Sequence, residues 1–205
     1  MTTELYLVRH GETDWNQQRR IQGLTDIPLN DTGREQARAT GRLLARRRWD
    51  AVFSSPLRRA LETAEIIAEE LGLPAPATVD ALVERNYGDA EGMNFLDIER
   101  KYPDRGSVPG QESREEVVAR VLPALHELAA AHPDQRLVVV SHGGAIRAVL
   151  TAVDPHYTHG MITNGSVHSF EFGDDVLKLI EFDDPIAVDS LDEQNAVEAR
   201  EEGLA

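Results

Sequence analysis

The stretch Leu5-Tyr6-Leu7-Val8-Arg9-His10-Gly11-Glu12 joins four apolar residues directly to a cation, an imidazole, a glycine and a carboxylate. A short apolar run that stops at a polar turn is typical of a buried parallel strand. In open α/β sheets, ligands bind beyond the carboxyl ends of such strands. Arg9 and His10 are therefore either solvated residues after a strand or the first members of a site, and the other strand ends decide between the two.

The rest of the chain alternates short apolar runs with helical patterns. We predict helices over residues 31–48, 56–71, 94–102, 113–132 and 145–152, and further strands over 51–53, 78–79, 137–140, 167–172 and 176–182. Such alternation predicts a mostly parallel sheet with helices on both faces, and the closing pair of strands predicts an antiparallel hairpin at its edge. We expect Asp31 or Thr32 to cap the first helix. The prediction is one three-layer α/β/α domain over residues 1–185, followed by an acidic tail over 186–205.

Composition excludes several classes of function. The chain of 205 residues has no cysteine, which removes thiol catalysis and cysteine-ligated zinc. A net charge of −15 argues against nucleic acid as a partner, because phosphate backbones attract clustered Lys and Arg. The start of the chain lacks the basic region of a signal peptide, and no apolar run approaches the roughly 18 residues that a membrane span needs. We therefore expect a cytoplasmic protein with no membrane partner.

Two other predicted strand ends carry matching residues. Val140 is followed by Ser141-His142-Gly143-Gly144, and Phe53 leads into Ser54-Ser55-Pro56-Leu57-Arg58-Arg59. Parallel strands end at the same edge of a sheet, so we expect two histidines and at least two arginines there. Helix N-termini beginning at Pro56 and Gly143 would add amides that favour an anion. Glycine after each histidine would let the backbone approach a ligand closely.

Other kinds of site fit these residues less well. Arginines repel cations and no His-x-x-x-His pattern is present, which disfavours a metal site. The glycine-lysine pattern of a P-loop and the Gly-x-Ser-x-Gly elbow of a serine hydrolase are both missing. A neutral imidazole can attack phosphorus, and arginines can neutralise the phosphoryl oxygens. The pattern therefore favours phosphate chemistry with histidine as the nucleophile.

These motifs resemble the histidine phosphatase superfamily, also called the phosphoglycerate mutase-like family. The resemblance spans roughly residues 4 to 172 and is carried by Leu7 to Thr13, Ser55 to Ala60 with Thr63-Ala64, Glu84 to Gly88, and Ser141 to Gly144. It implies the α/β/α fold of that family. It also implies a metal-independent phosphomonoesterase without a cofactor, which acts through a phosphohistidine on a small phosphorylated metabolite of the phosphosugar or phosphoglycerate type.

The resemblance implies a role for each matching residue. His10 would be the phosphorylated nucleophile, Glu84 would protonate the leaving alcohol and then activate water, and protonated His142 would stabilise the transferred group. The implied phosphate-binding residues are Arg9, Arg59, Asn16 and His142. The implied substrate contacts are Thr13, Gln22, Gly23 and Gly143. Outside these roles, we expect Arg58 to be solvated, Glu12 to orient the loop after His10, the segment with Met93 and Phe95 to shape specificity, and the remaining histidines, His126, His132, His156, His159 and His168, to be surface or structural.

Two alternative functions stay open. A cofactor-dependent phosphoglycerate mutase is disfavoured because the segment Gly88–Glu112 is short, has only Arg100, Lys101 and Arg105 as cations, and lacks the Arg-Arg-Ser-Phe pattern of mutases. Asn86 also stands where mutases tend to carry histidine. The other alternative is a non-catalytic module that binds a phosphorylated ligand. The sequence leaves the oligomeric state open, with a homodimer as one candidate.

Overall fold

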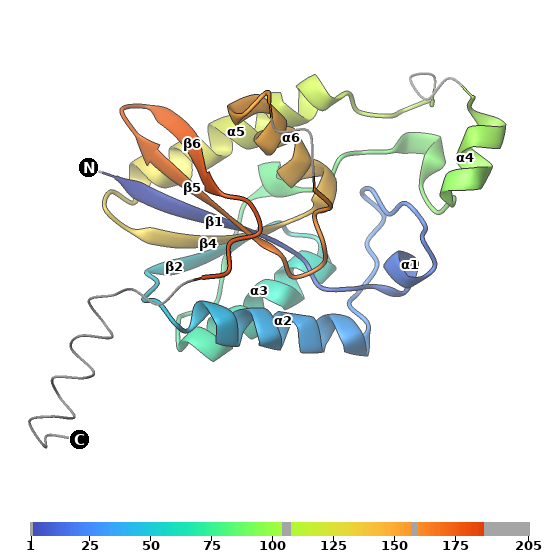
Figure 1. The fold of residues 1–205 in the computed structure, drawn as a ribbon. Coiled ribbons are helices and arrows are strands. Elements are labelled where there is room, and N and C mark those ends of the chain that lie inside the picture. The colour runs from blue at the N-terminus through green and yellow to red at the C-terminus, as the bar shows by residue number, and fades with distance from the viewer. Residues whose placement is uncertain (1, 104–107, 157–159, 187–205) are drawn as a thin grey trace, which may run out of the picture.

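The computed structural model describes residues 2–103, 108–156 and 160–186, and within them a six-stranded sheet lies between two layers of helices (Figure 1). The strands are β1 (Thr3–Arg9), β2 (Ala51–Ser54), β3 (Ala77–Thr78), β4 (Arg136–Ser141), β5 (Val167–Gly173) and β6 (Val176–Glu181). The helices are α1 (Asp14–Gln17), α2 (Asp31–Leu44), α3 (Arg58–Leu71), α4 (Phe95–Lys101), α5 (Arg114–Ala131) and α6 (Gly143–Val153), with short 3-10 helices η1 (Asp80–Leu82) and η2 (Gly88–Ala90).

The sheet has the predicted mixture of strand directions. Its order is β3-β2-β4-β1-β5-β6. The first four strands of that order run parallel, while β5 is antiparallel to β1 and β6 is antiparallel to β5. This confirms the α/β class with an antiparallel edge.

Alternating side chains of the central strands enter two separate cores. Leu5 and Leu7 of β1 pack with α5 and α6, whereas Tyr6 and Val8 pack with α2 and α3. The same alternation holds along β4, because successive side chains of a strand point to opposite faces. Figure 1 shows the two helix pairs on opposite faces of the sheet. Burial on both faces explains why β1 and β4 are continuous apolar runs.

The register of β1 and β4 brings two motifs together. Arg9 is paired with Ser141, so His10 and His142 leave the sheet side by side. The backbone N–H of His10 donates a hydrogen bond to the carbonyl of Ser141 at 3.0 Å. The predicted meeting of the two histidines at one sheet edge is therefore confirmed.

Several helix ends differ from the sequence prediction. The side chain of Asn30, not Asp31 or Thr32, caps α2 by accepting from the N–H of Gly33. Helix α2 ends at Leu44 instead of near residue 48, and α3 begins at Arg58, two residues after Pro56. Apolar periodicity places a helix but defines its ends poorly, because ends depend on which side chain captures the free amides.

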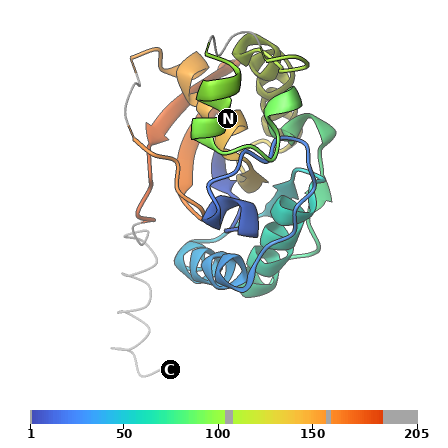
Figure 2. The same ribbon diagram turned by 90° about the vertical axis from the view of Figure 1, so that its right-hand side faces the viewer.

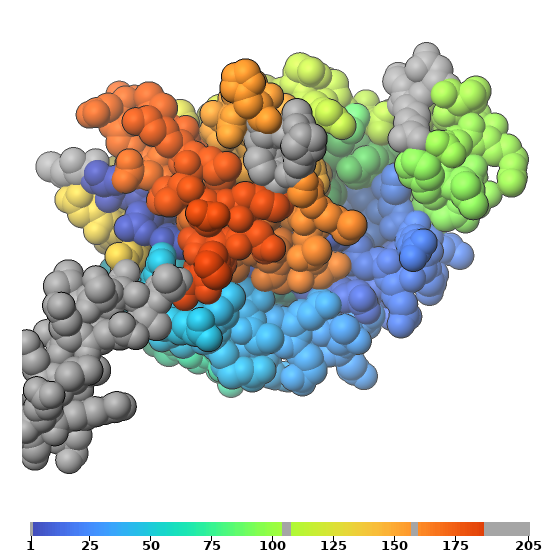
Figure 3. Space-filling view, in the orientation of Figure 1, coloured from blue at the N-terminus to red at the C-terminus, as the bar shows by residue number. Residues whose placement is uncertain are grey.

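A short helix, α1, lies between β1 and α2, where the sequence pattern predicts no helix. Thr13 and the side chain of Asn16 form a reciprocal capping box at its start. Downstream, residues 20 and 94 form a β-bridge, and the N–H of Ile21 donates to the carbonyl of Met93 at 3.0 Å. In Figure 3 the blue atoms of the first segment and the green atoms of the second accordingly lie against each other. Together they border the carboxyl edge of the sheet.

The C-terminal part of the chain is described only to Ile186. That residue, which we predicted to begin the acidic tail, is fully buried in the core beside α2 and α3. The predicted tail from residue 187 onward lies outside the described residues. Within the described part of the chain, no helix has the length and apolar character needed to cross a membrane.

Candidate active site

A cavity of about 390 Å³ lies at the carboxyl edge of the parallel strands, the edge that faces the viewer in Figure 2. Eight of the ten predicted site residues line it, namely Arg9, His10, Asn16, Gln22, Gly23, Arg59, Glu84 and Gly143. The other two, Thr13 and His142, are fully buried and are not among the lining residues. Residues from five separate stretches of sequence thus meet at one edge of the sheet.

His10 is buried, and its position fixes its tautomer. Its Nδ1 lies 2.7 Å from the carbonyl oxygen of Gly11. A carbonyl only accepts, so Nδ1 carries the proton and Nε2 has a free lone pair. Burial, followed by the charges of Arg59 and Arg9, lowers the pKa of His10 well below its usual 6.5. The ring is therefore a neutral imidazole near pH 7, the form that acts as a nucleophile.

His142 caps the start of α6 without a side-chain bond to the helix. Its ring centroid lies 5.2 Å from that of His10, and its Nε2 lies 2.8 Å from Oγ of Ser55. Burial, then the charges of Arg59, His10 and Arg9, lowers the pKa of His142 well below 6.5. Desolvation and adjacent cations therefore favour the neutral ring, and the role expected of a protonated His142 beside a phosphoryl group stays a prediction.

Arg59 and Arg9 are the two cations whose charges act on His10. Arg9 donates from Nη1 to the carbonyl of Ile162 at 2.6 Å, and Arg59 donates from Nη1 and Nη2 to the carbonyls of Thr25 and Gly23 at 2.9 and 2.7 Å. These bonds hold the two guanidinium planes. The Nε atom of each is buried without a partner among the described residues. Because such atoms are normally satisfied, both are donors that the described contacts leave available.

Glu84 reaches the cavity from the segment between η1 and η2. Its Oε2 accepts from the N–H of Gly144 and its Oε1 from the N–H of Ala145, both at 3.0 Å. Oε1 also accepts from the N–H of Arg85 at 2.7 Å. The first two donors belong to the first turn of α6, which begins directly after His142. The sequence motif around His142 therefore positions the carboxylate of the motif around Glu84.

Asn16 and Thr13 form one unit. Oδ1 of Asn16 accepts from both the N–H and the hydroxyl of Thr13 at 3.1 Å. Asn164, which donates to the carbonyl of His10 at 2.9 Å, also lies 3.4 Å from Asn16 Oδ1. Thr13 is thus placed to support Asn16 instead of lining the cavity, and its predicted contact with substrate remains only a prediction.

The expected close approach of a ligand stays a prediction for Gly143, which lines the cavity, but it does not explain Gly11 or Gly144. A Cβ atom on Gly11 would overlap the carbonyl oxygen of Gly33, so Gly11 is required by packing against α2, and it does not line the cavity. A Cβ on Gly144 would overlap Oε1 of Glu84 and lie 2.9 Å from the hydroxyl of Tyr87. Here, close approach of the protein's own carboxylate, and not of a ligand, requires glycine.

Several functional candidates were missed by sequence reasoning. The cavity is also lined by Tyr87, Gly144 and three arginines, Arg20, Arg114 and Arg147. Arg147 had a detectable signal, since it follows Gly144 by three residues and so lies on the same face of a helix. Arg114 had none, because its place depends on how α5 docks. Ser55 belongs to one of the sequence motifs but had no predicted role, and its hydroxyl contacts Nε2 of His142.

The remaining predictions near the site have mixed outcomes. Phe95 is half-exposed and lines a neighbouring cavity of about 590 Å³, which shares Ile21, Tyr87 and Arg114 with the first. Met93 lines neither of these two cavities. Arg58 is exposed, as expected. Oε1 of Glu12 accepts from the side-chain amide of Asn30 at 3.0 Å, in keeping with an orienting role for Glu12.

None of the described histidines without a predicted role lines the cavity. His168 is buried beside Phe182, with Nε2 3.0 Å from the hydroxyl of Ser166. His126 and His132 contact aromatic rings, and His156 is exposed. His159 lies outside the described residues. Among the residues that are described, no three His, Cys, Asp or Glu side chains are grouped as a metal site would need.

Comparison with known proteins identifies the class. The family model of the histidine phosphatase superfamily (branch 1) matches residues 5–185. The uncharacterized phosphatase PhoE of Bacillus subtilis (strain 168) is 42% identical over 183 residues, which cover 88% of this chain and 94% of that protein. The structure of a mycobacterial glucosyl-3-phosphoglycerate phosphatase superposes with a TM-score of 0.80 at 31% identity and covers 87% of this chain and 98% of its own.

The likeness extends to mutases. A 2,3-bisphosphoglycerate-dependent phosphoglycerate mutase of Methylobacterium sp. (strain 4-46) is 38% identical over 166 residues, 73% of this chain and 80% of that protein. The chain belongs to the histidine phosphatase superfamily. Relatives within reach of sequence comparison thus include both phosphatases and mutases.

Proposed function

We propose that this protein is a metal-independent phosphomonoesterase that transfers the phosphoryl group of a small phosphorylated metabolite to His10 and then to water. The observation that carries the proposal is the contact between Nδ1 of His10 and the carbonyl of Gly11, which leaves the lone pair of Nε2 free, near two arginines whose Nε atoms are buried. A general base or metal ligand would not need that pair of cations. A nucleophile that receives a phosphoryl dianion does.

The first half of the reaction forms a bond from Nε2 of His10 to phosphorus as the bond from phosphorus to the leaving oxygen breaks. Arg9 and Arg59 offset the charge on the transferred oxygens. Glu84, protonated for this step, gives its proton to the leaving oxygen, so that an alcohol departs. His142, whose ring centroid lies 5.2 Å from that of His10, is expected to contact the transferred oxygens as well.

The second half returns the enzyme to its starting state. The carboxylate of Glu84 takes a proton from water as the water oxygen attacks phosphorus. The bond from phosphorus to Nε2 breaks, its electron pair returns to His10, and inorganic phosphate leaves. Glu84 is then protonated again for the next cycle, so no metal or cofactor is needed to balance the reaction.

The metabolite is expected to carry a second negative group. Arg20, Arg114 and Arg147 line the same cavity, whose one acidic lining residue among the described ones is Glu84. The carbonyl of Gly160 accepts from Arg147 at 2.8 Å, so this contact leaves its positive charge without a carboxylate partner. A phosphoglycerate-type acid, which has a carboxylate besides its phosphate, uses such charge better than a phosphosugar whose sugar is uncharged.

The test is release of inorganic phosphate from a panel of phosphomonoesters in the presence of EDTA. We expect turnover that EDTA does not reduce and that His10→Ala abolishes. Strict dependence on an added metal, or full activity of His10→Ala, would refute the proposal. Interconversion of 3- and 2-phosphoglycerate that is stimulated by bisphosphoglycerate and exceeds hydrolysis would establish the mutase alternative. Tight binding of phosphate esters without any turnover would establish the non-catalytic module.

A further inference from the structure

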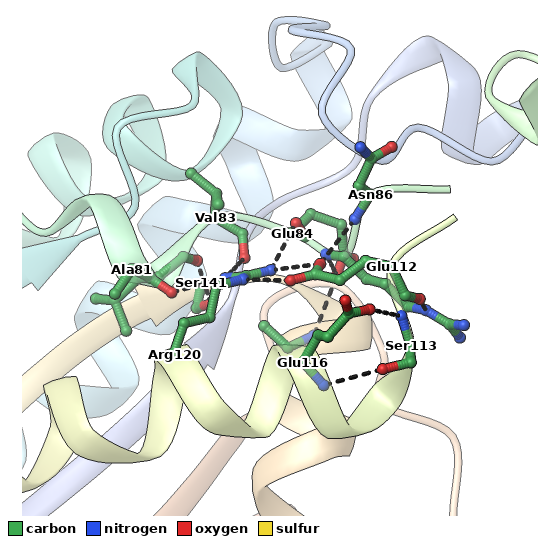
Figure 4. A network of polar contacts seen from close by, with 12 residues as sticks. Ala81, Val83, Glu84, Asn86, Glu112, Ser113, Glu116, Arg120 and Ser141 are labelled. Carbon is green, nitrogen blue, oxygen red and sulfur yellow. Dashed lines mark hydrogen bonds and ion pairs between the residues drawn. The ribbon is translucent and has the colours of Figure 1, made fainter. Parts of the chain in front are cut away.

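The segment that carries Glu84 is held by side chains at every carbonyl from residue 81 to residue 84. Arg120 of α5 donates from Nη1 to the carbonyls of Ala81 and Val83 at 2.7 and 2.8 Å, and from Nη2 to the carbonyl of Glu84 at 3.0 Å. The carbonyl of Leu82 accepts from the hydroxyl of Ser141 at 2.9 Å. Figure 4 shows Ala81, Val83 and Glu84 gathered around the guanidinium of Arg120.

The guanidinium of Arg120 is itself fixed by a carboxylate. Oε1 of Glu112 accepts from Nε of Arg120 at 2.7 Å, and Oε2 accepts from Nη2 at 3.0 Å. With the three carbonyls, this makes five hydrogen bonds, as many as the N–H groups that a guanidinium offers. The side chains of Arg120 and Glu112 are only 24% and 17% exposed, so this ion pair is screened less than a surface pair.

Glu112 also binds Arg85 and Asn86, the two residues that follow Glu84 in the chain. Its Oε2 accepts from the N–H of Asn86 at 3.1 Å, and its backbone carbonyl accepts from Nε of Arg85 at 2.6 Å. Burial raises the pKa of Glu112, but the bonds from Arg120 and Asn86 outweigh burial and lower it overall, so the carboxylate is ionised near pH 7. The pair therefore spans Glu84 from both sides along the chain.

Packing alone does not fix this segment. Leu82 is anchored in the core beside α5, but Glu84 lines both the site cavity and a second cavity of about 410 Å³. The second cavity is also lined by Val83, Glu112 and Arg120. With open space on two sides, the position of Glu84 depends on directed polar contacts instead of on side-chain packing.

We infer that Arg120, oriented by Glu112, is a positioning residue that sets where Glu84 gives and takes its proton. The inference rests on the proposed function, because that function makes Glu84 the proton donor and acceptor. Arg120 itself is assigned no contact with the reacting atoms. The two ends of Glu84 are then held by different elements. Helix α5 holds its backbone through Arg120, and α6 holds its carboxylate through the amides of Gly144 and Ala145.

A positioning role for a proton donor predicts a loss that depends on the leaving group. Nitrophenolate leaves without needing a proton, whereas the alkoxide of an alkyl phosphate such as glycerol 2-phosphate needs one. In Arg120→Met we expect kcat/KM for glycerol 2-phosphate to fall about 100-fold, within the range that general acid catalysis supplies. For 4-nitrophenyl phosphate we expect a change below about threefold, because that step depends little on Glu84.

The second half of the reaction supplies an independent readout. It needs Glu84 to activate water for every substrate. Arg120→Met should therefore release one equivalent of nitrophenolate in a fast burst, followed by slow turnover. Phosphohistidine should accumulate during this slow turnover and be detectable after an alkaline quench. Arg120→Lys keeps the charge but has three N–H donors instead of five, so we expect it to recover only part of the alkyl phosphate activity.

Two variants make the experiment decisive. Arg34→Met is the matched control, because Arg34 also binds a carboxylate and a carbonyl, those of Glu62 and Leu29. Unlike Arg120, Arg34 has no bond to the segment of residues 81–84 among the described contacts. It should leave the ratio of the two kcat/KM values unchanged. Glu112→Gln removes the charge beside Arg120 and retains the three carbonyl contacts, so the same selective loss is expected at about fivefold. This variant decides the matter if Arg120→Met does not fold.

The outcomes separate this inference from the proposed function. Equal losses on both substrates, or no loss on either, in variants that still form phosphohistidine would overturn the positioning role alone. An unaltered protein that neither hydrolyses phosphomonoesters with EDTA present nor forms phosphohistidine would overturn the proposed function instead.

Discussion

The Nδ1 atom of His10 lies 2.7 Å from the carbonyl oxygen of Gly11, and the contact gives the buried ring a single neutral tautomer. Burial and the charges of Arg59 and Arg9 lower the pKa of the same ring well below 6.5. An imidazole in this environment stays unprotonated at pH values where an exposed histidine is already charged.

This environment predicts the acid side of the pH profile. The neutral ring is the reactive form, so activity should be lost only as pH falls through the lowered pKa of His10. We expect kcat/KM for 4-nitrophenyl phosphate, corrected for titration of the substrate's own phosphate, to stay level through pH 6.5 and to decline well below it. A half-maximal rate at pH 6.5 would mean that His10 titrates like a solvated imidazole.

Gly144 gives a prediction about steric fit. A Cβ at this position would overlap Oε1 of Glu84, so Gly144→Ala should displace the carboxylate and lower kcat/KM for an alkyl phosphate about 100-fold. A Cβ on the preceding Gly143 would meet nothing nearer than Nε of Arg9 at 3.4 Å. Gly143→Ala should therefore cost about tenfold or less, and a larger loss there than at position 144 would contradict the role given to Gly144.

The arginines at the cavity predict a preference for doubly anionic substrates. Replacing Arg114 and Arg147 together with Gln should raise KM for 3-phosphoglycerate roughly tenfold, since exposed charge pairs each contribute up to about 1 kcal/mol. KM for 4-nitrophenyl phosphate should change less than about twofold, because it lacks the second anion. Arg100→Gln on α4 is the control, as the side chain of Arg100 is 81% exposed and pairs with Asp97. Equal shifts for both esters would argue against a second anionic group.

His168 links stability to pH. Burial, with a smaller effect of the Arg147 charge, lowers the pKa of His168 to about 4. The unfolded chain takes up this proton near pH 6.5, so stability is lost as pH falls below that value. Relative to His168→Asn, the free energy of unfolding of the unaltered protein should fall by about 2 kcal/mol between pH 7.5 and 5, as measured by urea denaturation. A difference independent of pH would show that His168 titrates alike in both states.

The parts of the fold that were predictable from sequence rest on local patterns. The continuous apolar runs of β1 and β4 indicate that both strands are buried on both faces. Gly72 ends α3 with a φ of 65°, a conformation that glycine adopts without strain. The two histidines could be brought together on paper because parallel strands share a carboxyl edge. The site residues in or directly after strands could be found in this way, whereas Gln22, Gly23 and Glu84 were predicted only through the family resemblance.

The features that were missed depend on tertiary contacts. The sequence around Arg120 does not indicate that it binds carbonyls 36 to 39 positions away in the chain. The lowered pKa of His142 follows from complete burial beside two arginines, which no sequence motif encodes. The choice of Asn30 as a cap over Asp31 was a local competition between adjacent residues of similar capping preference.

The central claim is that His10 carries the phosphoryl group, and direct detection of that group tests it best. The unaltered protein, with EDTA present, is mixed with excess 4-nitrophenyl phosphate, quenched in alkali within the first turnover and digested for mass spectrometry. We predict a phosphoryl group on the peptide that contains His10, and its absence from His10→Ala treated in the same way. Steady hydrolysis by the unaltered protein with no phosphorylated His10, or a phosphoryl group found on another residue, would contradict the account.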